Sequence, residues 1–295
     1  MLPPPGRPLR DAPTGRRNSS GLSRDVEILD LLSGPEAAHQ DGLRVLQIAE
    51  ALGRDKATIS RALATLADAG LVDRDADRLT YRLGSRLYAL AARTSEASMV
   101  QRARPILRQI AATTRETTHL CVLRGGNVLT LASELSSHVV GTTSWAGTTT
   151  AAWRTPSGRV LISDWDRASV ETWYKMHGHD AALVHPQESP APGAFSLLTE
   201  PMLDQVVVQD LETLHSELGR IRRRGFATSE AELEAGVVAA SAPVRDATGA
   251  VVAALNVSAP KARLGTRLED LGIYVTRCAA ALSTELGAPP RRVAD

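Results

Sequence analysis

Cysteines, aromatic side chains and long apolar runs are all scarce in this chain of 295 residues. Its 2 Cys, Cys121 and Cys278, lie far apart and form no CxxC pair, which excludes the common metal and redox motifs built on that spacing. With 2 Phe, 4 Tyr and 4 Trp, the core must be built mainly from Ala, Val and Leu. No apolar run approaches the roughly 18 residues of a membrane-spanning helix, and the start lacks the apolar centre of a signal peptide. We therefore expect a cytoplasmic protein with no membrane partner, no cofactor and no metal.

An excess of charge of either sign is also missing, because the formal net charge is only +1. A nucleic-acid partner is neither favoured nor excluded by this value, and any basic surface must be local. The first 22 residues are rich in Pro, Gly and Arg and predict a disordered arm. This basic arm could contact an anion such as DNA, or it could be a solvated tail with no role.

The clearest local pattern is a pair of helices in residues 43–70. The segments "LRVLQIAEAL" and "DKATISRALATLADAG" both have helical spacing, and only Gly53 and Arg54 separate them. Helices joined by so short a turn cross steeply, as in a helix-turn-helix. Ala49 permits close approach, Gly53 can adopt a positive φ, Asp55 can cap the second helix, and Ile59 can pack back on the first.

Flanking segments extend this pair into a winged helix. A helix is expected over residues 24–32, with Ser23 as its N-cap and Gly34-Pro35 as its stop, followed by a polar loop. After Gly70, short β-prone pieces at 71–72 and 79–83 predict a wing hairpin.

The remaining sequence predicts an α+β domain. A helical stretch with a break before Met99 or at Pro105 leads into a hairpin around residues 124–127. A second hairpin is expected with strands at 237–244 and 251–258, and helices are expected near 156–162, 203–224 and 268–286. Hairpins without βαβ crossovers favour an antiparallel sheet flanked by helices.

These motifs together resemble the IclR family of bacterial transcription regulators. The matching residues are Thr58, Arg61, Ala69-Gly70 and Tyr81-Arg82-Leu83-Gly84 in the first half, with "ETTHLCVL" and "IRRRGFATSEAELEAGVVAASAPVRDATGAVVAALNVSAP" in the second. The resemblance implies a winged helix-turn-helix at 23–84, a linker helix at 85–98, an effector-binding domain of GAF/profilin-like fold at 99–288 and a tail at 289–295.

The resemblance also implies a function. Members of the family bind double-stranded operator DNA as homodimers or homotetramers, and a small-molecule effector changes that binding. Repression of an adjacent catabolic operon is the commoner outcome, so we expect a repressor.

Candidate DNA-binding residues follow from the helix-turn-helix reading. The second helix of such a motif lies in the major groove, and residues near its start contact base edges. The candidates on the turn, this helix and the wing are Arg54, Lys56, Thr58, Ser60, Arg61, Arg74 and Arg78. Arg61 is the candidate for base reading, because arginine bonds bidentately to guanine. The alternative is a solvated charged face.

Candidate effector-binding residues follow from the family's pocket segment, which matches residues 147–159. Gly147, Thr155, Gly158 and Arg159 agree with the family pattern, whereas Ala151, Trp153 and Pro156 depart from it. The expected pocket residues are Trp145, Trp153, Arg154, Thr155, Ser157, Gly158, Ser229, Ala239 and Ser241. We expect a small, aromatic effector stacked on a tryptophan; in the alternative, Trp153 only fills the core.

Two other function classes stay open. In a ligand-processing enzyme, Ser157 would be the nucleophile, but it is not in a Gly-x-Ser-x-Gly motif and the chain has no Walker motif. His177, His179, Asp180 and His185 could be a metal cluster, although a surface loop explains them better. A winged helix that serves only for protein contacts is the third class.

Overall fold

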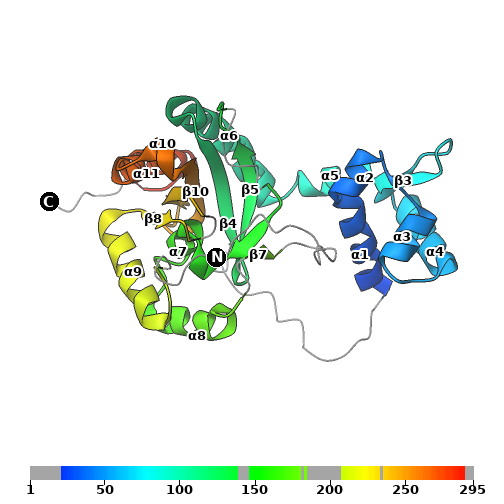
Figure 1. The fold of residues 1–295 in the computed structure, drawn as a ribbon, viewed down its shortest axis with the longest axis horizontal. Coiled ribbons are helices and arrows are strands. Elements are labelled where there is room, and N and C mark those ends of the chain that lie inside the picture. Colours follow the sequence, from blue (N-terminus) through cyan, green and yellow to red (C-terminus); the bar gives the residue numbers. More distant parts are fainter. Residues whose placement is uncertain (1–20, 139–145, 181–182, 185–206, 233–234, 290–295) are drawn as a thin grey trace. The chain divides into compact units, whose positions relative to one another are not determined.

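The computed structural model describes residues 21–138, 146–180, 183–184, 207–232 and 235–289, and the chain divides into two compact units that meet in sequence at Ser98 and Met99 (Figure 1). Of the arm predicted at residues 1–22, residues 1–20 lie outside the described residues, as do Trp145 and His185, and residues 21–22 lie in the first helix instead of the arm. The α+β class is confirmed.

The N-terminal unit is a winged helix-turn-helix. Its elements are α1 (Gly21–Ser33), α2 (Pro35–His39), β1 (Leu43–Arg44), α3 (Val45–Ala51), α4 (Lys56–Asp68), β2 (Val72–Arg74), β3 (Thr80–Leu83) and α5 (Ser85–Ala91). The strands form an antiparallel sheet in the order β1-β3-β2. Two expectations are wrong: Ser23 lies inside α1, so it is not the cap, and the expected polar loop contains α2, which begins at Pro35 because proline is preorganised for a first helical turn.

The turn between α3 and α4 has the expected geometry. Gly53 adopts a φ of +60°, and the Asp55 carboxylate accepts a hydrogen bond from the Thr58 backbone N–H at 2.8 Å. Hydrogen bonds from the side chain and backbone of Thr58 hold the pKa of Asp55 below its usual value. Ile48 and Ile59 are buried in one core cluster, so the packing of the two helices is confirmed.

The C-terminal unit is built on a seven-stranded antiparallel sheet of order β7-β6-β5-β4-β10-β9-β8. Its strands are β4 (Thr117–Arg124), β5 (Asn127–Glu134), β6 (Thr149–Ala151), β7 (Leu183–Val184), β8 (Ala227–Glu230), β9 (Val237–Arg245) and β10 (Val251–Pro260). The helices are α6 (Ser95–Thr114), the 3₁₀ turn η1 (Ala152–Arg154), α7 (Pro156–Leu161), α8 (Arg167–His177), α9 (Leu211–Arg224), α10 (Lys261–Leu264) and α11 (Leu268–Glu285). Both predicted hairpins are confirmed.

Alternation along the central strands gives the sheet two different faces. Leu120 and Leu255 point to the face covered by α6 and α11, while Cys121 and Ala254 point to the face covered by α7, α8 and α9. Figure 1 shows these two helix layers on opposite sides of the sheet. The second face, beneath α7, is the one that contains the cavity described below.

The helices differ from expectation at Pro105, at the start of α9 and in the presence of α8. The break expected before Met99 or at Pro105 lies at residues 92–94, between α5 and α6. Pro105 lies inside α6, because the buried Ala103, Ile106, Leu107 and Ile110 hold that helix on the sheet. Proline in a helix interior costs about 3 kcal/mol, and tertiary packing outweighs it here. Helix α9 begins at Leu211, where Asp210 caps it. Helix α8 was not predicted.

Candidate functional site

The first exposed surface of interest is the start of α4. Lys56, Ser60 and Arg61 are exposed and Thr58 is half-buried, while Ile59 and Leu63 point into the core. The Arg61 guanidinium donates to the Thr58 hydroxyl at 3.5 Å, which leaves most of its donors in solvent. The expected side chains therefore share one exposed helix end, as a groove-reading helix requires.

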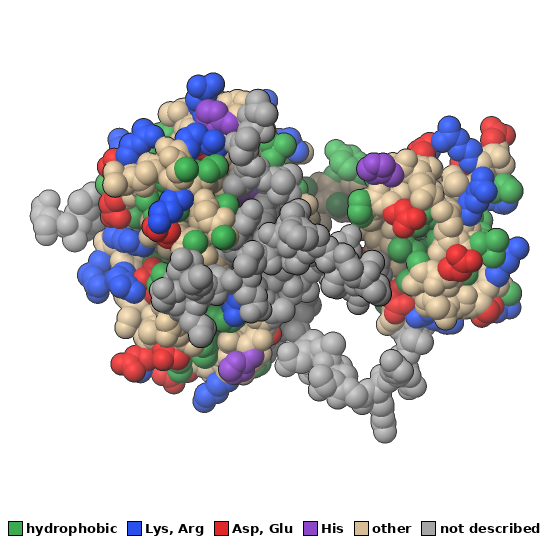
Figure 2. Space-filling model, in the orientation of Figure 1, with side chains coloured by type: hydrophobic (Ala, Val, Ile, Leu, Met, Phe, Trp, Pro, Cys, Tyr) green, Lys and Arg blue, Asp and Glu red, His purple; other side chains and the backbone are tan. Residues whose placement is uncertain are grey.

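The other arginines predicted at this surface are engaged within the protein. Arg54 pairs with Glu27 of α1 at 2.5 Å, and Arg78 pairs with Asp41 at 2.9 Å. Arg74 lies over the Tyr81 ring at 5.9 Å. Residues 21–98 hold ten Lys and Arg against twelve Asp and Glu, and Figure 2 shows both signs interspersed over this unit in that view. The net charge of this unit therefore does not favour a polyanion, and any basic surface on it is local.

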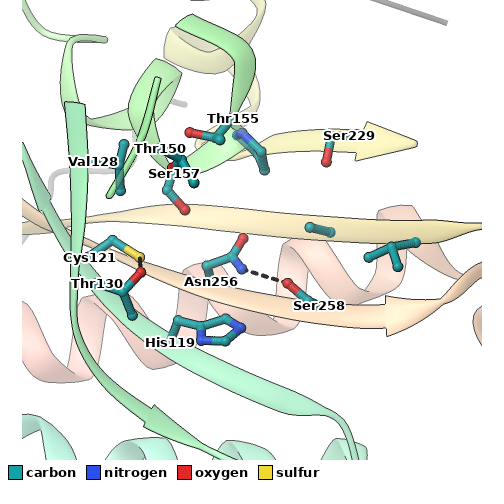
Figure 3. Close-up of a pocket in the computed structure, with 13 residues that line it drawn as sticks. His119, Cys121, Val128, Thr130, Thr150, Thr155, Ser157, Ser229, Asn256 and Ser258 are labelled. Carbon is teal, nitrogen blue, oxygen red and sulfur yellow. Dashed lines mark hydrogen bonds between the residues drawn. The ribbon is translucent and has the colours of Figure 1, made fainter. Parts of the chain in front are cut away.

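A second candidate site is a cavity of about 80 Å³ on the α7 face of the large sheet (Figure 3). Strands β4, β5, β6, β8, β9 and β10 and the start of α7 contribute its walls. The lining residues are His119, Cys121, Val128, Thr130, Thr150, Thr155, Pro156, Ser157, Ser229, Val237, Ala239, Asn256 and Ser258. This volume is well above the minimum of about 10–15 Å³ that one water needs, so the cavity can hold several waters or a compact small molecule.

Helix α7 is placed over the cavity by its N-cap and by a glycine. The Thr155 hydroxyl accepts from the Gly158 N–H at 3.1 Å, which caps the helix. A Cβ at Gly158 would lie 2.1 Å from the carbonyl oxygen of Ala152, so η1 and α7 can approach only because this residue has no side chain. Thr155 and Ser157 thereby project toward the strands below, as Figure 3 shows.

Gly158→Ala should lower the free energy of unfolding by about 1–3 kcal/mol, because backbone must move to admit the methyl group. Gly219→Ala is the matched control: its Cβ would meet only the end of the Arg223 side chain at 3.7 Å in the interior of α9. That change should stabilise by about 0.5–1 kcal/mol. Urea unfolding of both variants measures the difference, and equal effects would contradict the steric account.

Serine hydroxyls at the cavity contact each other instead of a base. The Ser241 hydroxyl lies 3.3 Å from the Ser157 hydroxyl and 3.1 Å from the Leu255 carbonyl oxygen. Activation of a serine needs a hydrogen-bonded imidazole or carboxylate. Among the described residues, the partners of Ser157 are the Ser241 hydroxyl and the Cys121 thiol, and neither is a base that would activate it.

The two titratable groups of the described lining are both uncharged at neutral pH. Burial lowers the pKa of His119 to about 4, and its Nδ1 lies 2.8 Å from the Ser133 hydroxyl. Burial also raises the pKa of Cys121 to about 11, against the smaller opposing effect of hydrogen bonds from Thr130 and Ser157. A ligand therefore meets a neutral imidazole and a neutral thiol.

His119 should make stability depend on pH. Because its folded pKa of about 4 lies below the value of 6.5 in the unfolded chain, the unfolded state binds more protons between these values. Stability therefore rises with pH through this window, and about 2 kcal/mol should be lost on acidification to about pH 5. Urea unfolding of wild type and His119→Gln at both pH values tests this; an equal pH dependence in the two proteins would contradict it.

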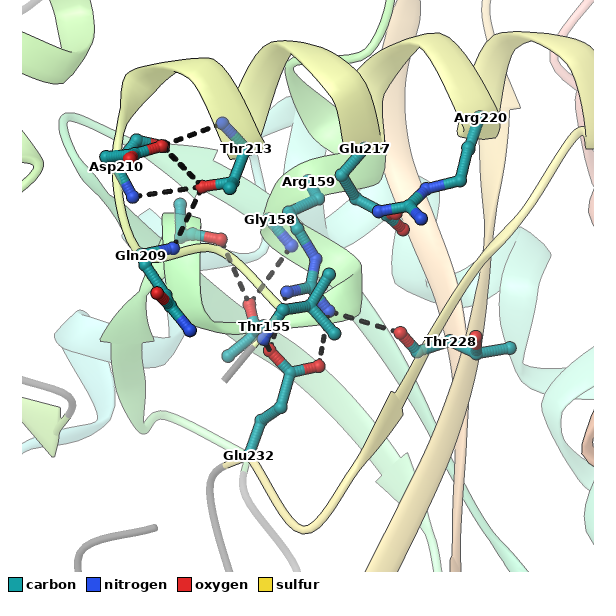
Figure 4. Close-up of polar contacts among 12 residues, drawn as sticks. Thr155, Gly158, Arg159, Gln209, Asp210, Thr213, Glu217, Arg220, Thr228 and Glu232 are labelled. Carbon is teal, nitrogen blue, oxygen red and sulfur yellow. Dashed lines mark hydrogen bonds and ion pairs between the residues drawn. The ribbon is translucent and has the colours of Figure 1, made fainter. Parts of the chain in front are cut away.

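A buried ion pair fixes α7 against β8 (Figure 4). Arg159 binds Glu232 through two hydrogen bonds, of 2.7 and 2.8 Å, and also donates to the Thr228 carbonyl oxygen at 3.2 Å. The Glu232 carboxylate accepts from the Val207 N–H at 3.2 Å. Burial alone would lower the pKa of Arg159, but the adjacent carboxylate outweighs this and the pKa is raised. The pair thus joins α7, the β8 strand that carries Ser229, and Val207.

Family models match both units of the chain. A family model described as IclR helix-turn-helix domain matches residues 21–76, and one described as Bacterial transcriptional regulator IclR C-terminal matches residues 91–183 and 199–284. The chain belongs to the IclR family of bacterial transcriptional regulators.

Relatives of this IclR-family chain are named as regulators. It is 28% identical to the HTH-type transcriptional regulator BhcR of Paracoccus denitrificans, over 97% of this chain and 95% of that protein. It is 25% identical to the HTH-type transcriptional regulator KdgR of Dickeya chrysanthemi, over 83% and 78%.

Solved IclR structures share the fold. The regulator from Alicyclobacillus acidocaldarius has a TM-score of 0.67 at 22% identity, covering 90% of this chain and 97% of that one. An IclR homologue from Microbacterium hydrocarbonoxydans, solved in complex with 4-hydroxybenzoate, has a TM-score of 0.67 at 22% identity, covering 90% and 99%.

The residues expected to bind an effector in this IclR-family protein fall into three groups. Thr155, Ser157, Ser229 and Ala239 line the cavity, and Ser241 lies behind Ser157. Gly158, Arg154 and Trp153 are not among the lining residues. Trp153 is buried in the core cluster beneath α7, α8 and α9, with the Arg154 guanidinium 4.6 Å from its ring. Trp145 lies outside the described residues.

Several lining residues were missed by the sequence reasoning. The expected pocket residues did not include His119, Cys121, Thr130, Thr150, Asn256 and Ser258, which all line the cavity. The sequence signal for these residues is a polar side chain at alternate positions of an otherwise apolar strand, as for Asn256 and Ser258 in "AALNVSAP". Alternate residues of a strand point to the same face of the sheet.

Two further findings concern other classes of site. Among the described residues, no group of three or more His, Cys, Asp and Glu side chains could hold a metal ion, and His177 instead contacts Asp180 at 3.0 Å. The helices that the structure describes include none that is both long and apolar enough to cross a bilayer.

Proposed function

We propose that this IclR-family regulator reads operator DNA with the start of α4 and that a small molecule held in the sheet cavity changes this binding. The observation that carries the proposal is the coexistence of the exposed Lys56, Ser60 and Arg61 on a helix-turn-helix with a polar cavity in the second unit. In this proposal Lys56 and Thr58 bind DNA phosphates, and Arg61 contacts a base edge. Arg74 and Arg78 on the wing contact the DNA backbone. The segments 23–84, 85–98 and 99–288 are proposed as the DNA-binding domain, linker helix and effector-binding domain.

The effector part of the proposal has two supports. A homologue of the same fold was solved with 4-hydroxybenzoate bound, and the cavity here contains the buried Asn256, whose Oδ1 has no hydrogen-bond partner among the described residues. The proposal does not extend to an aromatic effector stacked on Trp153, because that ring packs in the core. Binding without turnover is favoured over catalysis, since the partners of Ser157 among the described groups are the Ser241 hydroxyl and the neutral Cys121 thiol, and neither is a base.

Self-association and repression complete the proposal. On α1, Leu22 is 72% exposed, and on α5, Tyr88 is 80% exposed. Apolar side chains of this size on the DNA-binding unit suit a contact between two copies, and a symmetric dimer fits a palindromic operator. In the repressor form proposed here, the dimer or tetramer occupies an operator near the genes that it controls.

A gel-shift assay with the DNA next to its own gene tests the proposal. The full chain should shift that DNA in preference to a scrambled fragment, and a cavity ligand should change the affinity. A chain that shifts neither fragment would be a protein-contact module, and turnover of a bound ligand by the purified protein would restore the enzyme alternative.

A further inference from the structure

The described lining of the cavity is rich in hydroxyl groups and carries no formal charge at neutral pH. The hydroxyl groups come from Thr130, Thr150, Thr155, Ser157, Ser229 and Ser258. To these are added the Asn256 amide, the neutral imidazole of His119 and the neutral thiol of Cys121. A ligand therefore meets neutral donors and acceptors on several sides.

Charged side chains next to the cavity are already paired. Arg159, one turn into α7, is fully buried and gives two hydrogen bonds to Glu232. Glu230, the residue after Ser229, pairs with Lys261. Neither of these charges belongs to the lining, so neither is available as the counter-ion of a bound ligand.

Asn256 offers a specific contact at the centre of the site. Asn256 is almost fully buried, and Figure 3 shows its side chain among those that line the cavity. In the sheet it pairs with His119 on β4 and with Ser241 on β9. Its Nδ2 donates to the Ser258 hydroxyl at 2.9 Å, and its Oδ1 has no partner among the described residues. A buried amide oxygen without a partner is unfavourable, and a ligand donor would remove this cost. A hydroxyl group both donates and accepts, so it satisfies either orientation of the amide.

We propose that the cavity binds an uncharged, hydroxyl-rich molecule, a short polyol or neutral sugar, in preference to a carboxylate of the same size. This inference rests on the proposed effector function. A carboxylate group would lose its hydration without gaining a cation among the described lining residues, and the group itself offers Asn256 Oδ1 no donor. His119 could supply a cation only by taking up a proton. Because pH 7 lies about three units above its pKa of about 4, this protonation would weaken the binding of a carboxylate about a thousandfold.

Matched pairs of probes test the inference directly. Glycerol and glycerate, and erythritol and erythronate, differ only in whether one end is a hydroxyl group or a carboxylate. Calorimetric titration of the full chain at neutral pH should give at least about tenfold tighter binding of the alcohol in each pair. On acidification to about pH 5 the affinity of the alcohol should not change, whereas that of the carboxylate should rise.

Variants then locate the bound probe. Asn256→Ala and Ser229→Ala should each weaken binding of the alcohol about tenfold, a change of about 1.4 kcal/mol. Ser229 is half-buried on the edge strand β8, so its truncation leaves the fold intact even if Asn256→Ala does not. Ser95→Ala, an exposed serine on α6, is the control and should bind like wild type.

Each contrary outcome has a separate meaning. Tighter binding of the carboxylate at neutral pH would overturn the ligand class while leaving an effector in the cavity. Binding of the alcohol that survives both variants would overturn the site. If neither member of either pair binds, the inference is overturned, whereas the proposed effector function is contradicted only if ligands of other classes also leave operator affinity unchanged.

Discussion

Replacing Glu232 with alanine is expected to lower the free energy of unfolding of the C-terminal unit by about 3–5 kcal/mol. The side chains of Arg159 and Glu232 are 0% and 1% exposed, so the variant would leave a buried guanidinium charge without the carboxylate that it hydrogen-bonds and almost without water. The Val207 N–H would lose its acceptor as well. Figure 4 shows how the carboxylate lies against the guanidinium.

Two comparisons isolate the cause of this loss. Glu230→Ala removes a carboxylate from the same segment, but Glu230 and Lys261 are 53% and 57% exposed, so the expected cost is below about 1 kcal/mol. The double variant Arg159→Met with Glu232→Leu removes both charges and should recover much of the stability. Urea unfolding followed by circular dichroism measures all three. Similar losses for Glu232→Ala and Glu230→Ala would show that burial of the pair is not the cause.

The same ion pair should matter for the response to a ligand. Arg159 lies two residues after Ser157 in α7, and Thr228, which accepts from Arg159, precedes Ser229. Loss of the pair would free two walls of the cavity to move, while leaving the N-terminal unit unchanged. Glu232→Ala should therefore retain operator binding at low temperature but lose the effect of a ligand on it.

The helix-turn-helix could be predicted from sequence because its determinants are local. A positive φ at Gly53, the cap at Asp55 and the spacing to Ile59 all lie within a few residues of one another. The boundaries of α6 could not be predicted in this way. Pro105 disfavours a continuous helix locally, and only the packing of residues such as Leu107 against the sheet overrides it.

The cavity was only partly predictable because its residues meet through strand register. Asn256 is paired with His119 on one side and with Ser241 on the other, although these residues lie far apart in the chain. The segment around Thr155 was found because its cap and turn are local. Whether Trp153 faces a ligand or the core depends on how η1 packs under α7, which no local pattern specifies.

Replacing Arg61 with alanine is expected to remove specific operator binding while leaving the fold intact. Arg61 is exposed near the start of α4, and its hydrogen bond to Thr58 is long, at 3.5 Å, so little stability depends on it. A bidentate contact to guanine is worth about 1–3 kcal/mol of discrimination, and a symmetric dimer loses it at both half-sites. The affinity of the variant for the operator should fall toward its affinity for unrelated DNA. The affinity for unrelated DNA should itself change little.

Two matched variants separate base reading from charge. Lys56→Ala should weaken binding to all DNA sequences alike. It should also reduce the slope of log affinity against log salt concentration by about one, as expected for the loss of one phosphate contact. Arg277→Ala removes an equal charge from an exposed position on α11 and should have no effect. Gel-shift titrations with operator and scrambled DNA at several salt concentrations measure these differences. If Arg61→Ala keeps the wild-type preference for the operator, α4 does not read bases through this residue, because no other change in the variant could compensate for the lost contact.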